Sequence, residues 1–441
     1  MANWSELSFD VLEQVVKRLP REIEEFVRFS VVCKSWRFCA VNQKLPCSPW
    51  LMFANKENDV KSNDDDEEGI RGFYIISSNR ILNLKLPTQG RRCWGTPYGW
   101  LITMGLDLKI NIFNPLSGAQ LSLPPQPTFQ HQLDYHSWPR RVCRIFIRKI
   151  ALASNLCSTF PSTLDQGTVA MAIYGIRNYL AFASPRDKVW TCLDGPQQVQ
   201  DIIFFNDHFY VVSFQGVLRV CELGTAHPSA VAIASLPNCC RNYPLYLIVL
   251  SGELHLVERI TTCDDYDSCS DDDTVTIDDG DCGDPVEISS DNDTATVDDG
   301  DNDDDSDGDR VDGGQDDDRD EDPNKEEEEY ESYTSDFHYD TKCFRVFRLN
   351  SMRRTWSKVD DLGDHALFIG NNTSFAISTF QYPDFKSNCI YFTDDIYETF
   401  QYGHCDMGVY DMGKDSVSPF DISNDEPSKF SRPVFFMPIP L

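Results

Sequence analysis

The sequence predicts a mainly β protein in which a short helical segment precedes a β-propeller. Apolar residues recur at helical spacing over roughly the first 42 residues, and from about residue 71 the period changes to two. Short strands and turns rich in Asn, Gly or Pro then repeat at intervals of tens of residues. Antiparallel hairpins repeated in this way are typical of a ring of blades, which protects its strand edges by closing on itself.

The helical segment carries its apolar residues in two blocks. In the first block Ser8 is a candidate N-cap and Pro20 a stop, and the apolar positions are Leu7, Val11, Leu12, Val15, Val16 and Leu19. The second block runs from Ile23 through Cys33 and Trp36 to Ala40. So short a segment cannot bury all these side chains by itself, and several must therefore face another domain or another protein.

The β pattern is clearest in five stretches. Most combine an alternating strand, a turn and a second strand that ends in Leu-Pro or reaches a Trp, and they cover residues 73–87, 109–124, 218–237, 344–356 and, more weakly, 408–413. A propeller over residues 71–263 and 330–441 would give six blades of about 51 residues or seven of about 44. We expect six blades, and seven stays open.

An acidic segment at residues 264–329 interrupts the β pattern. It holds 32 acidic and 3 basic residues, and hence almost all of the chain's net charge of −32. With so few apolar residues it cannot offset its ordering entropy, so we expect a disordered, internally duplicated insert between two propeller strands. The remaining boundaries that we predict are a helical domain at 1–45 and an acidic linker at 46–70.

Charge and composition exclude several function classes. Without the insert the chain is close to neutral, which argues against nucleic-acid binding. No apolar run approaches the roughly 18 residues of a membrane helix, and no secretory signal opens the chain. The 16 cysteines form no C-x-x-C pair, so we expect reduced thiols, packed mostly as small hydrophobes, in the cytoplasm or nucleus.

Three motifs suggest other chemistry, and each has a plainer interpretation. Residues 408–415 approach a phosphate-binding loop, but Asp415 stands where Ser or Thr would hold Mg²⁺, so we expect a strand and its turn. Residues 303–308 resemble the start of a calcium loop, but Gly314 occupies the position of the bidentate Glu. His365 beside Asp364 fits a turn better than an acid–base pair. We therefore expect no catalytic residues, no metal and no cofactor.

The aromatic cluster of Trp94, Tyr98 and Trp100 allows two interpretations. Aromatic side chains are common hot spots of binding surfaces. At the start of a blade they more often fill the core between blades, which is the interpretation that we favour.

The N-terminal segment resembles an F-box. The family run Leu-Pro-x-Asp-hydrophobic-Leu corresponds to Leu7–Leu12, and residues 31–37 read Val-Val-Cys-Lys-Ser-Trp-Arg, a run specific for plant F-box proteins. Ser8 replaces the usual proline, which weakens the expected contact. The resemblance implies a Skp-type adaptor as partner, and we predict that the residues that bind it are Leu7, Ser8, Val11, Leu12, Val15, Leu19, Cys33 and Trp36. Trp36 itself fits internal packing better than contact.

The rest of the chain is similar to plant F-box proteins with a KIB-type β-propeller, through residues 93–101, 113–117, 121–125, 362–368 and 388–395. This resemblance implies a non-catalytic, substrate-recruiting subunit of an SCF-type ubiquitin ligase, linked to cullin through the adaptor and holding an unidentified client protein on the propeller. Two alternatives remain open. The propeller could be an enzyme or small-molecule receptor, or the chain could be a binding module without ligase function.

Overall fold

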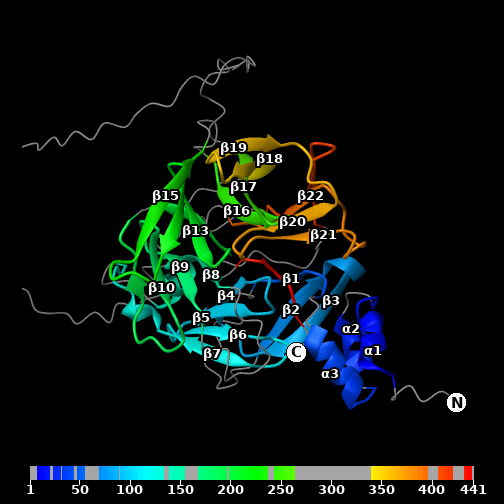
Figure 1. Cartoon of the computed structure of the whole chain (residues 1–441). Helices are drawn as coiled ribbons and strands as arrows, with labels where there is room; N and C mark the ends of the chain where they lie inside the picture. The colour runs from blue at the N-terminus through cyan, green and yellow to red at the C-terminus, as the bar shows by residue number, and fades with distance from the viewer. Residues whose placement is uncertain are drawn as a thin grey trace, which may run out of the picture. The chain divides into compact units, whose positions relative to one another are not determined.

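The structure is a computed structural model, and the blades and helices are built from the residues that it describes (Figure 1). These are residues 7–19, 23–30, 32–43, 47–54, 69–88, 90–133, 139–153, 167–195, 198–236, 243–263, 339–395, 406–420 and 432–439. The expected disordered insert at 264–329 and the calcium-loop-like residues 303–308 lie outside them.

Three helices form the N-terminal domain: α1 (Phe9–Val16), α2 (Ile23–Ser30) and α3 (Lys34–Gln43). Leu12, Val16, Phe29 and Cys39 are buried between them. The positions of Leu12 and Val16, four residues apart on α1, place both on one helical face. The predicted helical segment is thus confirmed.

Six antiparallel or mixed sheets follow, which confirms the mainly β class and six blades rather than seven. Blade 2 is typical, with its strands in chain order: β4 (Arg91–Gly95), β5 (Leu101–Gly105), β6 (Ile110–Phe113) and β7 (Gln120–Leu123). The first strands of blades, such as β4, β8 and β16, lie toward the middle of the ring (Figure 1).

Blades 3 and 4 repeat the arrangement. The helix α4 (Pro139–Ile145) leads into blade 3, which contains β8 (Ile147–Leu152), β9 (Ala170–Tyr174), β10 (Tyr179–Ala183) and β11 (Thr191–Cys192). Blade 4 contains β12 (Val199–Phe205), β13 (His208–Ser213), β14 (Val217–Glu222) and β15 (Ser229–Ser235).

Blade 5 contains the strands on both sides of the acidic segment. Its strands are β16 (Leu245–Leu250), β17 (Glu253–Cys263), β18 (Tyr339–Asn350) and β19 (Thr355–Val359). Cys263 at the end of β17 pairs with Tyr339 at the start of β18. The acidic segment therefore connects two adjacent, paired strands of one blade.

Blade 6 has five strands, in the spatial order β21 (Phe375–Ser378), β20 (His365–Ile369), β22 (Cys389–Phe392), β23 (Gly408–Asp411) and β24 (Ser416–Pro419). The strands β20 and β22 are parallel, because the chain forms the β20–β21 hairpin before it returns. The predicted strand and turn at 408–415 is confirmed, since β23 and β24 pair as a hairpin.

Blade 1 closes the ring with strands from both ends of the propeller. Its order is β25 (Val434–Phe436), β1 (Trp50–Met52), β2 (Gly69–Ile75) and β3 (Arg80–Leu86). Gly95 of blade 2 allows β25 to approach closely, because a Cβ there would meet the Phe435 carbonyl oxygen at 1.8 Å. The prediction of a linker over 46–70 is wrong at Trp50–Met52, where three apolar residues are too few to show a period.

The hydrophobic core is divided into one cluster for each of the six blade interfaces. Trp94 and Trp100 lie in the cluster between blades 2 and 3, with Tyr98 packed against it, which confirms the core interpretation of these aromatics. The other five clusters join blades 3 and 4, 4 and 5, 5 and 6, 6 and 1, and 1 and 2. Each blade thus buries both faces, and no interface of the ring lacks a core.

The cysteines that the structure describes are packed mostly in the apolar core. Among the cysteines whose side chains the structure describes, all are free, and Cys39, Cys93, Cys143, Cys221 and Cys389 are among those that are buried. Their packing as small hydrophobes is confirmed for these positions.

Candidate functional site

The N-terminal helices carry an apolar strip on the surface of α1. Val11 and Val15 are four residues apart on α1 and share one face of the helix, and Leu7 precedes the N-cap residue Ser8. Val11 is 45% exposed, whereas Leu7 and Val15 are half-buried against the cluster beneath. Of these three predicted residues, Val11 is the one that is largely exposed, and Leu7 and Val15 remain partly accessible.

Other predicted adaptor-binding residues point inward. Leu12 is only 1% exposed and belongs to the domain's own core. Trp36 packs on Phe29, with ring centroids 4.5 Å apart, as its expected role in internal packing requires. Leu19 is half-buried against the same core, and Cys33 is partly exposed after α2.

Ser8 occupies the N-cap position of α1 but does not use its hydroxyl as a cap. Its φ of −64° and ψ of 152° are those of an N-cap, and its carbonyl accepts hydrogen bonds from the amides of Val11 and Leu12. Its side chain makes no capping hydrogen bond within the described residues. The predicted N-cap is therefore confirmed by the backbone position of Ser8 and not by a hydrogen bond of its hydroxyl.

Sequence reasoning missed a second exposed apolar group. Phe9 on α1 is 42% exposed and Phe38 on α3 is 62% exposed, and their ring centroids are 6.0 Å apart. Val32, between α2 and α3, is also exposed. The sequence could have indicated this group, because Phe9 and Phe38 fall outside the apolar positions of the helical core. Two such aromatic side chains on a small helical domain are unusual unless a partner covers them.

The propeller contains a pocket where blades 3, 4, 5 and 6 meet, with about 330 Å³ of open space including its mouth. We call it the inner pocket. The first strands of three consecutive blades line it, with Arg148 and Lys149 from β8, Gln200 and Asp201 from β12, and Leu245 and Tyr246 from β16. Gly370, Asn371 and Asp395 of blade 6 complete it.

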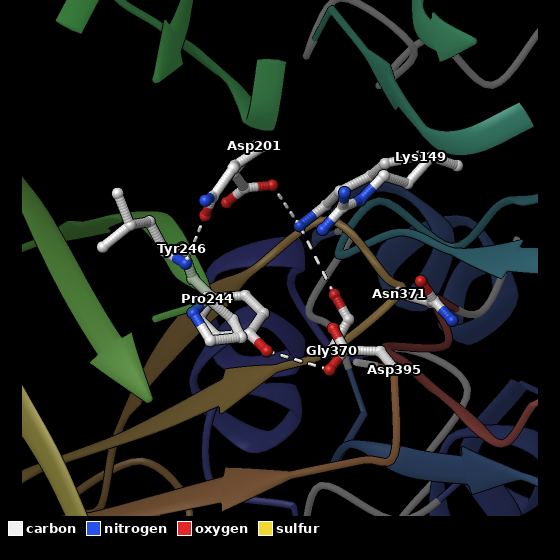
Figure 2. A pocket seen from close by; sticks show the side chains of 10 residues that line it. Lys149, Asp201, Pro244, Tyr246, Gly370, Asn371 and Asp395 are labelled. Carbon is white, nitrogen blue, oxygen red and sulfur yellow. Dashed lines mark hydrogen bonds and ion pairs between the residues drawn. The ribbon is translucent and has the colours of Figure 1, made fainter. Parts of the chain in front are cut away.

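Charged groups of the inner pocket are paired across blades. Lys149 forms a buried ion pair with Asp201, and its ammonium also donates to the carbonyl of Gly370 at 3.4 Å (Figure 2). Asp201 accepts from the backbone amide of Leu247 at 2.6 Å. Burial raises the pKa of the Asp201 carboxyl, and the charge of Lys149 opposes that shift.

A second network extends from the pocket into the interface of blades 5 and 6. The Tyr246 hydroxyl donates to Asp395 at 2.8 Å, and Arg259 forms ion pairs with Asp395 at 2.9 Å and Asp406 at 3.0 Å (Figure 2 for Tyr246 and Asp395). Burial raises the pKa of Asp395, whereas the Arg259 charge and the Tyr246 hydrogen bond lower it. The polar groups that converge here therefore satisfy one another.

The His365–Asp364 pair has a third member that the sequence did not reveal. His365 Nδ1 lies 3.2 Å from Asp364, and its Nε2 lies 3.5 Å from the hydroxyl of Ser251, in the turn between β16 and β17. The order resembles a Ser-His-Asp triad. Ser251 is exposed, however, in a two-residue turn with Gly252 whose positive φ values are typical of a type I′ hairpin. Because Ser251 is exposed, solvent competes for these contacts. We therefore interpret the Ser251, His365 and Asp364 side chains as a surface link between blades 5 and 6.

A helical domain of this kind, followed by a closed β ring, defines a class of protein: the F-box protein with a propeller. Sequence comparison bears this out. An F-box domain model matches residues 4–48, and the KIB1-4 beta-propeller model matches residues 73–411. The chain therefore belongs to the KIB1-4 beta-propeller family and carries an F-box ahead of that domain. Proteins with this architecture are typically adaptors, and F-box domains generally bind Skp-type adaptors.

F-box proteins of Arabidopsis thaliana match this chain at low identity. The F-box protein SKIP23 is 22% identical over 434 residues, covering 93% of this chain and 90% of that protein. An F-box/kelch-repeat protein is 28% identical over 219 residues, covering 48% of this chain and 52% of its own. A further F-box protein is 25% identical over 254 residues, which cover 55% of this chain and 64% of that relative.

None of the helices in the described part of the chain is long and apolar enough to cross a membrane. Among the same residues, no group of three or more His, Cys, Asp or Glu side chains is arranged to hold a metal ion.

Proposed function

We propose that this chain is the substrate-recruiting subunit of an SCF-type ubiquitin ligase. The F-box helices bind a Skp-type adaptor, which links to cullin, and the propeller holds a client protein. The gain is effective concentration and orientation of a client lysine, and the chain itself supplies no chemistry. A cytoplasmic or nuclear location goes with this role.

The observation that carries the proposal is the exposed apolar surface of the helical domain. Val11, Phe9 and Phe38 are each more than two-fifths exposed although Leu12, Val16 and Phe29 already fill a core beneath them. Two groups of exposed apolar side chains on so small a helical domain mark a binding surface. Helical segments of this kind bind partners through apolar anchors at a spacing of three or four residues.

Co-purification with a plant Skp-type adaptor tests the proposal. The variant Val11→Asp should lose the adaptor, because an interfacial carboxylate would be desolvated without a partner. The matched control is Ile70→Asp, the same kind of change at a propeller side chain that is 73% exposed, and it should leave adaptor binding unchanged. Adaptor binding that survives both substitutions would remove α1 from the interface.

The same preparation separates the ligase from a bare binding module. A ligase subunit retains cullin together with the adaptor, whereas a binding module retains neither. If the wild-type chain failed to retain a Skp-type adaptor, the ligase role would fall and the binding-module alternative would replace it.

A further inference from the structure

We propose that the inner pocket is a client-binding site, and that its ligand is a single carboxylate, the side chain of an Asp or Glu residue of a client peptide, with Arg148 as its anchor. The inference rests on the proposed role as substrate receptor, and it names the chemistry by which the propeller would recognise a client. Four features of the pocket carry it.

Two backbone irregularities coincide at the pocket. The pairing of β8 with β9 shifts between Ile147 and Lys149, so Arg148 is the extra residue of a β-bulge. In β12 the pairing shifts between Val199 and Asp201, which makes Gln200 a bulge residue as well. Bulges redirect side chains and are common beside functional sites. Here both bulge residues line the same pocket.

One bulge has a structural explanation and the other does not. Gln200 accepts a hydrogen bond from the Leu245 amide at 2.8 Å, beside the bond from Asp201 to the Leu247 amide. The β12 bulge thus joins blade 4 to blade 5. The guanidinium of Arg148, by contrast, makes no hydrogen bond or ion pair with any described residue, and only its backbone carbonyl is used, by Trp94.

Arg148 is therefore the one charged side chain lining the pocket that lacks an ion-pair partner among the described residues. Lys149 is paired with Asp201, and Asp395 is paired with Arg259. The charge of Arg148 does reach the pocket, since it contributes to lowering the pKa of Asp395 against the effect of burial. A half-buried guanidinium presents a planar set of donors that matches a carboxylate.

Asn371 supplies a second group for a ligand. It is 6% exposed, lines the pocket, and its amide makes no hydrogen bond with any described side chain or backbone group. The amide atoms are not among the fully buried polar atoms that lack a partner, so the pocket leaves them accessible, and a ligand can replace water there. Its NH₂ can donate to a carboxylate, whereas the neighbouring Lys149 is already engaged.

The charge of the surroundings selects a carboxylate over a phosphate. Asp201 and Asp395 both line the pocket, and each is paired with only one cation there. A phosphorylated side chain brings nearly two negative charges, and Arg148 can balance only one of them. A carboxylate brings a single charge and leaves no excess.

Three capped peptides test this in the full chain bound to its adaptor: Gly-Gly-X-Gly-Gly, with X as Glu, Gln or phosphoserine. Affinity is measured by saturation-transfer NMR for the wild type, Arg148→Gln and the matched control Arg141→Gln. Arg141 is exposed on α4 and does not line the pocket. The Glu peptide should bind wild type and Arg141→Gln equally. Arg148→Gln should weaken binding of the Glu peptide about tenfold, as expected for loss of a charge-assisted hydrogen bond. The Gln peptide should bind the wild type as weakly as the Glu peptide binds Arg148→Gln.

Each other outcome overturns the inference. Equal binding by wild type and Arg148→Gln would show that the carboxylate lies elsewhere, and tighter binding of phosphoserine would reverse the charge argument. An undetectable interaction of the Glu peptide with wild type would reject the site. Adaptor retention is scored in the same samples, so a failure of the pocket and a failure of the ligase role are distinguished.

Discussion

Arg259 of blade 5 and Asp406 of blade 6 form a buried ion pair between two blades. The Arg259 guanidinium donates to the carboxylate of Asp406 at 3.0 Å and to its backbone carbonyl at 2.9 Å. Arg259 is 0% exposed and lies on β17, whereas Asp406 belongs to blade 6. The hairpin that carries the acidic segment is thereby tied to the next blade. Burial opposes the charge of Arg259, but Tyr246, Asp395 and other neighbours raise its pKa above the ordinary value.

Replacing Arg259 by Met should lower the free energy of unfolding by about 3–5 kcal/mol. The change leaves Asp395 and Asp406 buried without their cation, and breaking a buried pair on one side has an effect of this size. Urea unfolding measures it. The control Arg348→Met removes an exposed pair with Glu253 at 3.7 Å and should change stability by less than about 1 kcal/mol. Similar small losses in both variants would show that the buried network does not stabilise the ring.

Replacing residues 264–338 by Asn-Gly should leave the propeller folded. Because Cys263 and Tyr339 already pair, a two-residue Asn-Gly turn can join the strands. A shorter connection also lowers the entropic cost of closing the loop. The thermal midpoint should therefore stay the same or rise by a few degrees. Differential scanning calorimetry measures the midpoint. A fall of more than about 3 °C, or roughly 2 kcal/mol at about 2.1 cal/mol/K per residue, would mean that the segment contributes to the fold.

A chain that ends at Cys263 should aggregate, in contrast to the internal deletion. It lacks β18, the whole of blade 6 and β25, the strand with which β1 closes blade 1. Two blades would then expose strand edges and apolar faces to solvent. Size-exclusion chromatography and light scattering measure whether the truncated chain aggregates. A soluble, monomeric product with a cooperative transition would replace the single ring by two independent domains.

Leu7 and Ser8 should have opposite effects on adaptor affinity. Leu7→Ala removes part of a leucine anchor worth roughly 1.5–3 kcal/mol and should weaken binding about tenfold. Ser8→Pro should strengthen it, because the φ of −64° already suits proline, no side-chain cap is lost, and the free segment becomes more rigid. Calorimetric titration with the adaptor measures both, and circular dichroism controls for loss of helix. Wild-type affinity in a folded Leu7→Ala variant would exclude Leu7 as an anchor.

Cys33 should be the thiol that reports adaptor binding. The Ser35 hydroxyl, 3.0 Å from its sulfur, lowers the pKa of Cys33, so more of it is thiolate near pH 8. Burial raises the pKa of Cys143 to about 12, which keeps that thiol protonated. Iodoacetamide at pH 8, followed by peptide mass spectrometry, should therefore modify Cys33 faster than Cys143, and saturating adaptor should slow the reaction at Cys33. An unchanged rate at Cys33 in the complex would place it outside the interface.

The helical segment and the hairpins could be predicted because they depend on local patterns, whereas the blade number, left open between six and seven, was decided by the structure. Alternating residues such as those of Phe344–Asn350 specify a strand wherever one face is buried, and the spacing of Leu12 and Val16 specifies a helix. Trp50–Met52 could not be recognised as a strand, because three residues show no period. The segment is a strand because it pairs with β2 on one side and, on the other, with β25 near the C-terminal end of the chain. The adaptor-binding residues were predicted as a set, and only the packing separates the exposed Val11 from the buried Leu12.

The sequence by itself thus determined the order of domains, the propeller and the family, because periodicity and motif are properties of neighbouring residues. The tertiary structure alone decided the inner pocket. Arg148, Asp201, Tyr246 and Asn371 come from four blades, and nothing in their local sequence indicates that they converge. Closure of the ring brings them together, and the register shifts in β8 and β12, which follow from pairing across strands, put Arg148 and Gln200 in its wall.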